Sequence, residues 1–167
     1  MIAAEPVMVP VAAGPGGPEV LLLDARESGL DEHGLRRSAR AQGSAVAPCV
    51  SRSYRHPYAL VASHDQPVGV DIERIEPFDP AFLKSICTPP ERSLPVDELD
   101  PARYATSIWC SKEALSKALG DALHYDPSRL GSPMFWPDGR SGPWRARPLP
   151  APPGHTAWLC WCAPRGN

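Results

Sequence analysis

The chain has 167 residues, of which 17 are basic and 19 acidic, and carries a formal net charge of -2 at pH 7. This length is enough for one core, or for two small lobes that share one, and leaves no room for separate catalytic and partner-binding domains. Because neither sign of charge forms a long run, the charge pattern does not indicate nucleic acid or a membrane surface as a partner.

The apolar segments and the cysteines indicate a cytoplasmic protein. The longest apolar stretches fall short of the roughly 18 residues that a membrane-spanning helix needs. The first ten residues, MIAAEPVMVP, lack the basic start and apolar run of a signal peptide. The five cysteines are odd in number and have no C-x-x-C spacing, so we interpret them as reduced core residues rather than metal ligands.

The first quarter of the chain predicts a tail, a strand and a basic segment. Residues 1–18 are mostly Pro, Gly, Ala and Val without a clear period, and we expect a flexible N-terminal tail. The apolar run at residues 20–24 (VLLLD) is typical of a short buried strand. Residues 28–41 are polar and include three arginines that a helix could carry on its surface.

Two extended runs follow, at residues 57–63 (PYALVAS) and 67–73 (PVGVDIE), joined by a three-residue polar turn. This spacing predicts an antiparallel hairpin. In the second run, alternation places Asp71 and Glu73 on one face and the apolar residues on the other. Two carboxylates at this spacing lie roughly 7 Å apart, which lets both reach one cation, directly or through water.

The second half of the chain predicts helices followed by short strands. Residues 80–87 indicate a short helix, and residues 101–119 a longer one that Gly120 ends. Three segments separated by Pro and Gly turns predict short strands: residues 136–139, 144–147 and 155–162.

Within the long helix, Trp109, Glu113 and Lys117 recur every four residues and share one stripe. If this stripe faces Asp71 and Glu73, Glu113 completes a set of oxygen ligands that suits Mg²⁺ together with water and substrate phosphate. Taken alone, the D-x-E pair is more often a solvated strand end. Glu113 and Lys117 alone would likewise be an ordinary surface pair.

Together, the two motifs resemble those of the 4′-phosphopantetheinyl transferase superfamily. Residues 67–73 are similar to its G-[VI]-D-[IVL]-E strand, and residues 109–120 (WCSKEALSKALG) to its W-[ST]-x-K-E-[AS]-x-x-K-x-x-G helix, with Cys110 at the Ser/Thr position. Two weaker likenesses lie at residues 51–53 (SRS), where the family has Ser-His-Ser, and at residues 88–92 (TPPER), where it has an aromatic-rich stretch ending in Glu.

The resemblance favours the two-lobed branch that activates peptide and polyketide synthases over the trimeric holo-acyl-carrier-protein synthases, whose metal-binding Asp lies near the N-terminus. It implies an α+β fold of two pseudo-symmetric lobes, each an antiparallel sheet with a helix, and a site between them. Two-lobed members are generally longer, and most of the deficit lies ahead of Ser51, so we expect an abridged N-terminal lobe. We expect one compact domain over residues 19–167, with lobes at about 19–75 and 76–167.

Members of this family transfer the phosphopantetheine arm of coenzyme A to a serine of an apo acyl or peptidyl carrier protein, with Mg²⁺ bridging the pyrophosphate. Carried over, the metal ligands are Asp71, Glu73 and Glu113. Glu113 is the first candidate for the base and Glu91 the second, while Lys117 would grip the phosphates. We expect a monomer that acts in secondary metabolism, by analogy with the two-lobed branch.

The remaining coenzyme contacts that the resemblance implies are polar or basic: Ser51, Arg52, Lys112, Lys117, Arg36 and Arg40. Arg52 stands where the family has His, and its guanidinium can hold a phosphate but cannot exchange a proton near neutral pH. Arg36, Arg37 and Arg40 would replace the family's basic G-[RK]-P segment, which is not recognisable here.

Two other interpretations stay open. The chain could be a family-derived module that binds coenzyme A or a partner without transfer, as the shortened front and Arg52 suggest. It could also be an enzyme repurposed for another acyl or phosphate substrate in the same pocket.

Overall fold

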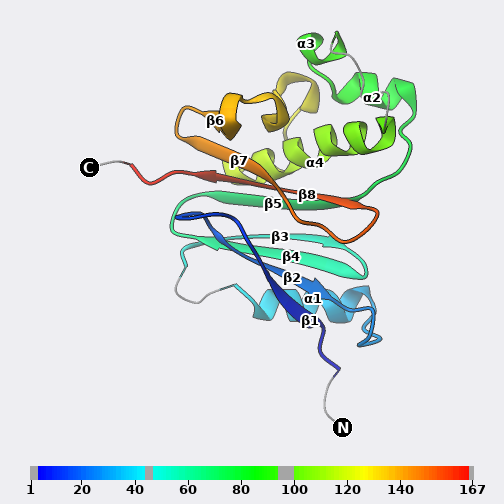
Figure 1. Cartoon of the computed structure of the whole chain (residues 1–167), viewed down its shortest axis with the longest axis vertical. Helices are drawn as coiled ribbons and strands as arrows, with labels where there is room; N and C mark the ends of the chain where they lie inside the picture. The colour runs from blue at the N-terminus through cyan, green and yellow to red at the C-terminus, as the bar shows by residue number, and fades with distance from the viewer. Residues whose placement is uncertain (1–3, 44–46, 94–99, 166–167) are drawn as a thin grey trace.

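The structure is a computed structural model that describes residues 4–43, 47–93 and 100–165. It consists of two four-stranded antiparallel sheets packed against each other, with a helix on the outer face of each (Figure 1). The predicted α+β fold, with two lobes that each combine an antiparallel sheet and a helix, is confirmed.

The first sheet has the strand order β1-β2-β4-β3. Its strands are β1 (Val7–Val11), β2 (Glu19–Asp24), β3 (Cys49–Arg55) and β4 (Tyr58–His64). The outer face is covered by α1 (Glu32–Ala41), which begins where the Asp31 carboxylate accepts a hydrogen bond from the Gly34 N–H at 2.7 Å. Leu35 and Ala39 are the buried side chains that attach α1 to the sheet.

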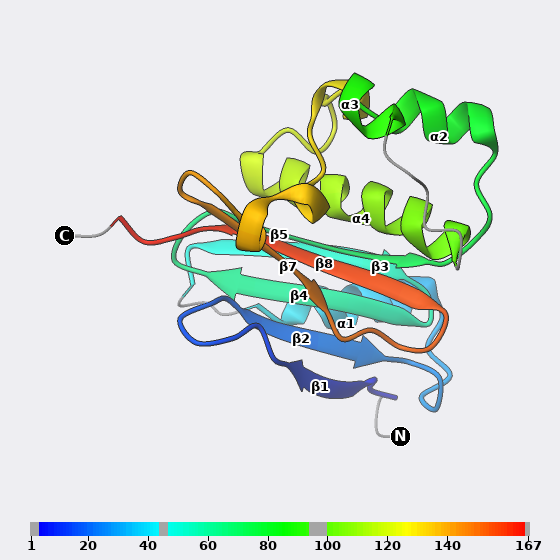
Figure 2. The same cartoon turned by 45° about the horizontal axis from the view of Figure 1, so that its top comes forward.

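The second sheet has the order β5-β8-β7-β6. Its strands are β5 (Val68–Arg74), β6 (Arg140–Ser141), β7 (Trp144–Leu149) and β8 (His155–Cys162). The helices of this lobe are α2 (Pro80–Ile86), α3 (Pro89–Arg92) and α4 (Pro101–Leu119), followed by the 3₁₀ turns η1 (Pro127–Arg129), η2 (Pro133–Phe135) and η3 (Pro137–Gly139). Helix α4 lies on the outer face of the sheet, and α2 and α3 lie beyond it (Figures 1 and 2).

Helix α4 has the ends that its sequence predicts. Asp100 accepts a hydrogen bond from the Arg103 N–H at 2.9 Å, and Pro101 occupies the first turn, where its missing N–H is not needed. Gly120 ends the helix with a φ of 83°, in the left-handed region that glycine tolerates. A second glycine, Gly69, lets the helix approach β5, because a Cβ there would lie 1.9 Å from the Ala114 carbonyl oxygen.

The space between the sheets is filled by apolar side chains from both lobes. Leu60 and Ala62 of β4 meet Val70 and Ile72 of β5 and Leu159 of β8 in one buried cluster. The alternation predicted for the second run is therefore confirmed on its apolar side. The opposite face of β5, which carries Asp71, is turned toward α4.

Strands β3 and β5 are the adjoining edges of the two sheets, and serine hydroxyls connect them. Ser51 Oγ accepts a hydrogen bond from the Val70 N–H at 3.1 Å, and Ser53 Oγ accepts one from the Ile72 N–H, also at 3.1 Å. Both bonds are buried. This β3–β5 junction joins the lobes through side chains.

The predicted hairpin between residues 57–63 and 67–73 is wrong. Strand β4 pairs with β2 and β3, whereas β5 pairs with β8. The polar turn instead carries the chain from one sheet to the other. Strand β5 lies in the second sheet, where one of its faces packs on the apolar layer between the sheets and the other packs on α4. The division between the sheets consequently falls between His64 and Val68 rather than near residue 75.

Two further expectations need correction. Residues 7–11, placed in a flexible tail, form β1, which pairs along its length with β2 and extends the first sheet. Residues 136–139 belong to 3₁₀ turns rather than to a strand, because Pro133 and Pro137 each start a tight turn there. Residues 1–3 of the tail lie outside the described residues.

The remaining segments agree with the sequence more closely. Residues 20–24, 144–147 and 155–162 all lie in strands. All five cysteines are free thiols. Among the described helices, none combines the length and apolar character that crossing a bilayer requires.

Candidate functional site

Asp71 is the centre of a buried polar cluster between β3, β5 and α4. Its Oδ1 accepts hydrogen bonds from Ser53 Oγ at 3.0 Å and from Lys117 Nζ at 2.9 Å. Its Oδ2 is buried and has no hydrogen-bond partner among the described residues. The residue is only 4% exposed, so this oxygen needs a donor or a cation to offset the loss of water.

Lys117 lies where the helical stripe predicts, one turn beyond Glu113 and against β5. Besides Asp71, its ammonium donates to the Val70 carbonyl at 3.0 Å. The side chain is 21% exposed, so the charge remains within reach of a ligand while the buried contacts fix its position.

Glu73 lies two residues along the same face of β5. Its Oε2 accepts a hydrogen bond from Arg55 Nη2, across the β3–β5 junction. Burial, reinforced by the charge of Asp71, raises the pKa of Glu73 to about 7, and these two effects outweigh the opposing influence of Arg55. A further positive charge beside Glu73 would therefore stabilise its ionised form.

Glu113 approaches from α4. Its Oε1 accepts a hydrogen bond from the Tyr125 hydroxyl, which fixes one carboxylate oxygen. Burial raises the pKa of Glu113; the Tyr125 hydrogen bond opposes this shift and the charge of Asp71 adds to it. Asp71 therefore acts electrostatically on both glutamates, as expected of three carboxylates gathered in one place.

The carboxylates do not already enclose a metal ion. Within the described part of the chain, no three Asp, Glu, His or Cys side chains converge as a ligand set, and Arg55 and Tyr125 satisfy Glu73 and Glu113 instead. The donor set still fits a hard divalent cation, because all its members are carboxylates and one buried oxygen of Asp71 has no partner in the described part of the chain. The residues that could hold Mg²⁺ are therefore Asp71, Glu73 and Glu113.

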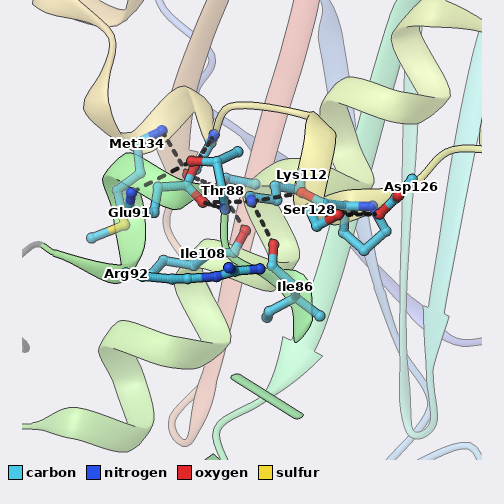
Figure 3. Close-up of polar contacts among 12 residues, drawn as sticks. Ile86, Thr88, Glu91, Arg92, Ile108, Lys112, Asp126, Ser128 and Met134 are labelled. Atoms are coloured by element: carbon cyan, nitrogen blue, oxygen red, sulfur yellow. Dashed lines mark hydrogen bonds and ion pairs between the residues drawn. The ribbon is translucent and has the colours of Figure 1, made fainter. Parts of the chain in front are cut away.

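Lys112 and Glu91 form a separate, buried ion pair inside the second lobe (Figure 3). Lys112 Nζ donates to Glu91 Oε2 and to the Ile86 carbonyl, each at 2.6 Å, and to the Pro127 carbonyl at 2.9 Å. Its side chain is 0% exposed. The predicted coenzyme contact by Lys112 is not supported, because three internal acceptors use its three donors.

Glu91 is equally occupied. Its Oε1 accepts a hydrogen bond from the Ser132 N–H at 2.7 Å, and its Oε2 one from the Thr88 N–H at 2.9 Å, which completes the capping box of α3. A carboxylate with these donors and an ammonium around it stabilises the packing of α2, α3 and α4. The structure thus gives Glu91 a structural role in place of the predicted base role.

Arg52 and Ser51 are also used within the fold. Arg52 Nε donates to the Ala39 carbonyl at 3.0 Å and its Nη2 to the Gln42 carbonyl at 2.7 Å, so the guanidinium caps the C-terminus of α1. Ser51 is buried in the β3–β5 junction. Neither side chain turns toward Asp71 as a free coenzyme contact.

Of the two predicted arginines of α1, Arg36 lines a hollow that it shares with Arg55 and Glu73. Arg36 pairs with Glu32 at 2.8 Å, and its guanidinium stands 4.3 Å from the centre of the Tyr54 ring. Arg40 is exposed. Of the predicted site residues, the structure therefore brings Asp71, Glu113 and Lys117 near Glu73, places Arg36 in the hollow that Glu73 also lines, and leaves Arg40 and Arg52 apart.

Sequence reasoning did not assign three residues of this cluster. Ser53 belongs to the SRS segment, so its motif gave a usable signal. Arg55 and Tyr125 lie outside every motif, and nothing in their sequence context indicates that they contact Glu73 and Glu113.

A hollow of about 540 Å³ opens between the lobes beside Glu73. Aromatic and charged side chains line it, among them Arg36, Tyr54, Arg55, Glu73, Phe82 and Trp109. Trp109 belongs to the same stripe of α4 as Glu113, and Glu73 is the member of the carboxylate cluster that lines the hollow, so the hollow adjoins the cluster at Glu73.

Comparison with known proteins agrees with this geometry. Residues 67–143 match the family model of the 4′-phosphopantetheinyl transferase superfamily. The match begins just before β5 and includes α4, the two elements that carry Asp71, Glu73, Glu113 and Lys117. This segment of the chain is similar to the 4′-phosphopantetheinyl transferase superfamily, in agreement with the resemblance of its motifs. No curated protein matches the chain.

Proposed function

We propose that the chain is a Mg²⁺-dependent transferase that moves 4′-phosphopantetheine from coenzyme A to a serine of an apo acyl or peptidyl carrier protein, a holo-acyl-carrier-protein synthase activity. The observation that carries the proposal is the buried oxygen of Asp71 that has no hydrogen-bond partner among the residues the structure describes. It lies among further carboxylates and beside Lys117, within the segment that matches the family.

In this reaction the serine oxygen forms a bond to the phosphorus next to the pantetheine arm. The bond from that phosphorus to the leaving oxygen breaks, and 3′,5′-adenosine bisphosphate departs with the electron pair. Mg²⁺, when held by Asp71, Glu73 and Glu113, would neutralise charge on the pyrophosphate. Lys117 adds a positive charge from a fixed position against β5.

The serine proton needs an acceptor, for which Glu113 is the better of the two predicted candidates. Burial raises its pKa, which brings a carboxylate closer to the operating pH of a general base. Tyr125 fixes one of its oxygens and leaves the other available. Glu91 is enclosed by its own donors.

The test is intact-mass analysis of several apo carrier proteins incubated with the chain, coenzyme A and Mg²⁺. Transfer adds roughly 340 Da to the carrier, and EDTA should abolish the gain. Asp71→Asn and Glu113→Gln should each lose the activity. Glu76→Gln, which changes an exposed glutamate next to the site, should retain it. A mass gain that is the same in all three variants would contradict the assignment.

The rival proposal, a binding module without transfer, has one observation in its favour. The Arg52 guanidinium donates hydrogen bonds to carbonyls at the end of α1 and is therefore not free to bind a phosphate. Coenzyme A binding detected by calorimetry, without a mass gain on any carrier, would favour this second function.

A further inference from the structure

The side chain of Arg55 joins the two lobes at the carboxylate cluster. Arg55 is the last residue of β3, and it pairs with Glu73 on β5 of the other lobe. The Glu73 side chain is 14% exposed, whereas that of Arg55 is 45% exposed. The carboxylate is therefore fixed within the protein, while the guanidinium has solvent beside it into which it can move.

Arg55 also changes the charge that the cluster offers to a cation. Asp71, Glu73 and Glu113 carry three negative charges when ionised, and Lys117 already balances one of them. With Arg55 on Glu73, one net negative charge remains; without it, two remain, which matches a divalent ion. A guanidinium on a ligand oxygen also repels an incoming cation at short range.

A second acceptor for Arg55 lies on its own lobe. Glu32, in the first turn of α1, pairs with Arg36 at 2.8 Å. Arg36 lowers the pKa of Glu32 most, and the charges of His56 and Arg55 add to this effect. Glu32, Arg55 and Glu73 all line the hollow between the lobes. The hollow thus offers both the room and the carboxylate for a second position of the guanidinium.

We propose that Arg55 is an internal competitor of the metal ion. It holds Glu73 when no ion is bound, and it moves to the Glu32 side of the hollow when Glu73 becomes a ligand. Arg55 thereby raises the divalent-ion concentration at which the site fills. This inference rests on the proposed function, because it takes Glu73 as one of the metal ligands.

The test is a Mn²⁺ titration of the full chain, in which EPR measures the free ion. Mn²⁺ replaces Mg²⁺ because it takes the same oxygen ligands and has an EPR signal. Arg55→Gln should bind Mn²⁺ about tenfold more tightly than the unsubstituted chain. Arg74→Gln removes the same charge from an exposed arginine 4.0 Å from Glu76 and should change the affinity by less than about twofold. Glu73→Gln should weaken binding about tenfold or more.

The outcomes separate this inference from the proposed function. If Arg55→Gln binds no more tightly than Arg74→Gln while Glu73→Gln binds weakly, the competitor role is overturned and the metal site stands. If Glu73→Gln binds normally, Glu73 is not a ligand and the inference also fails, whereas the carrier mass assay decides on transfer independently. Circular dichroism checks that each variant is folded. If Arg55→Gln unfolds, Arg55→Lys replaces it, since lysine keeps the positive charge and loses the forked donor. Arg55→Lys should bind Mn²⁺ more tightly than the unsubstituted chain, by less than Arg55→Gln would.

Discussion

Ser53 donates its hydroxyl hydrogen to Asp71 Oδ1 at 3.0 Å, across the boundary between the two sheets. The same hydroxyl oxygen accepts a hydrogen bond from the Ile72 N–H at 3.1 Å. One small side chain of the first lobe thus fixes both the main chain and the central carboxylate of the second. The orientation of Asp71 depends on how the lobes are joined.

Ser53→Ala tests this dependence, with Ser51→Ala as its matched control. Each substitution leaves one buried N–H of β5 without an acceptor, which should lower the free energy of unfolding by about 1–3 kcal/mol. Only Ser53→Ala also removes a donor from Asp71. Urea denaturation should show a loss for both variants, larger for Ser53→Ala because the buried Asp71 also loses a donor, and the carrier assay should show lower activity for Ser53→Ala. Equal activities would show that Asp71 does not need Ser53.

Lys112→Met tests whether Lys112 serves the buried ion pair or contacts coenzyme A. It leaves Glu91 charged and buried, which should cost about 3–5 kcal/mol of stability. The double substitution with Glu91→Gln should recover part of this loss, because no unpaired charge then remains inside the lobe. Chemical denaturation measures both effects. A stable Lys112→Met variant with weaker coenzyme A binding would instead support the contact predicted from the sequence.

Gly69→Ala tests the close approach of α4 to β5. The added Cβ would meet backbone atoms, the Ala114 carbonyl oxygen at 1.9 Å and the Ala118 nitrogen at 2.6 Å, so the helix must move. We expect a loss of about 1–3 kcal/mol in thermal or urea unfolding and a loss of transfer, because α4 carries Glu113 and Lys117. Gly131→Ala is the control, since no described atom outside its chain neighbours lies within 4 Å of its added Cβ.

Arg52→Met decides between a helix cap and a coenzyme contact. Without the guanidinium, carbonyls at the end of α1 lose their donors, and stability should fall by about 1–2 kcal/mol. The affinity for coenzyme A, measured by isothermal titration calorimetry, should stay within about twofold, because Arg52 is already engaged inside the protein. A loss of affinity larger than the loss of stability would restore the predicted phosphate contact.

The sequence predicted best those features that depend on neighbours along the chain. The ends of α4 follow from Asp100, Pro101 and Gly120, and alternation in β5 correctly separated the apolar residues from Asp71. The helical stripe placed Lys117 on the side of α4 that meets β5. Each of these patterns involves residues that are close together in the sequence and lie within one helix or one strand.

The features that were missed depend on partners distant in sequence. Residues 64–66 have the length and polarity of a hairpin turn, and only the burial of β5 on both faces shows that the strand joins another sheet. Arg52 and Lys112 have the residue types of a phosphate site, yet their acceptors on α1 and near Ile86 are set by packing. Side-chain type indicates what a residue can bind, and tertiary structure decides which partner it finds.

The β3–β5 junction also has a consequence for assembly. Strands β1 to β4 all come from residues 7–64, and β5 to β8 all from residues 68–162, so every main-chain ladder is complete within its own half of the chain. Residues 65–67 link the halves, and serine hydroxyls and apolar side chains hold them together. The two halves of the chain are thus arranged like two subunits joined by a short linker, and Asp71 lies at the interface between them. A chain cut within the link would therefore keep both sheets whole, and recovery of the site would report directly on how well the two fragments find each other.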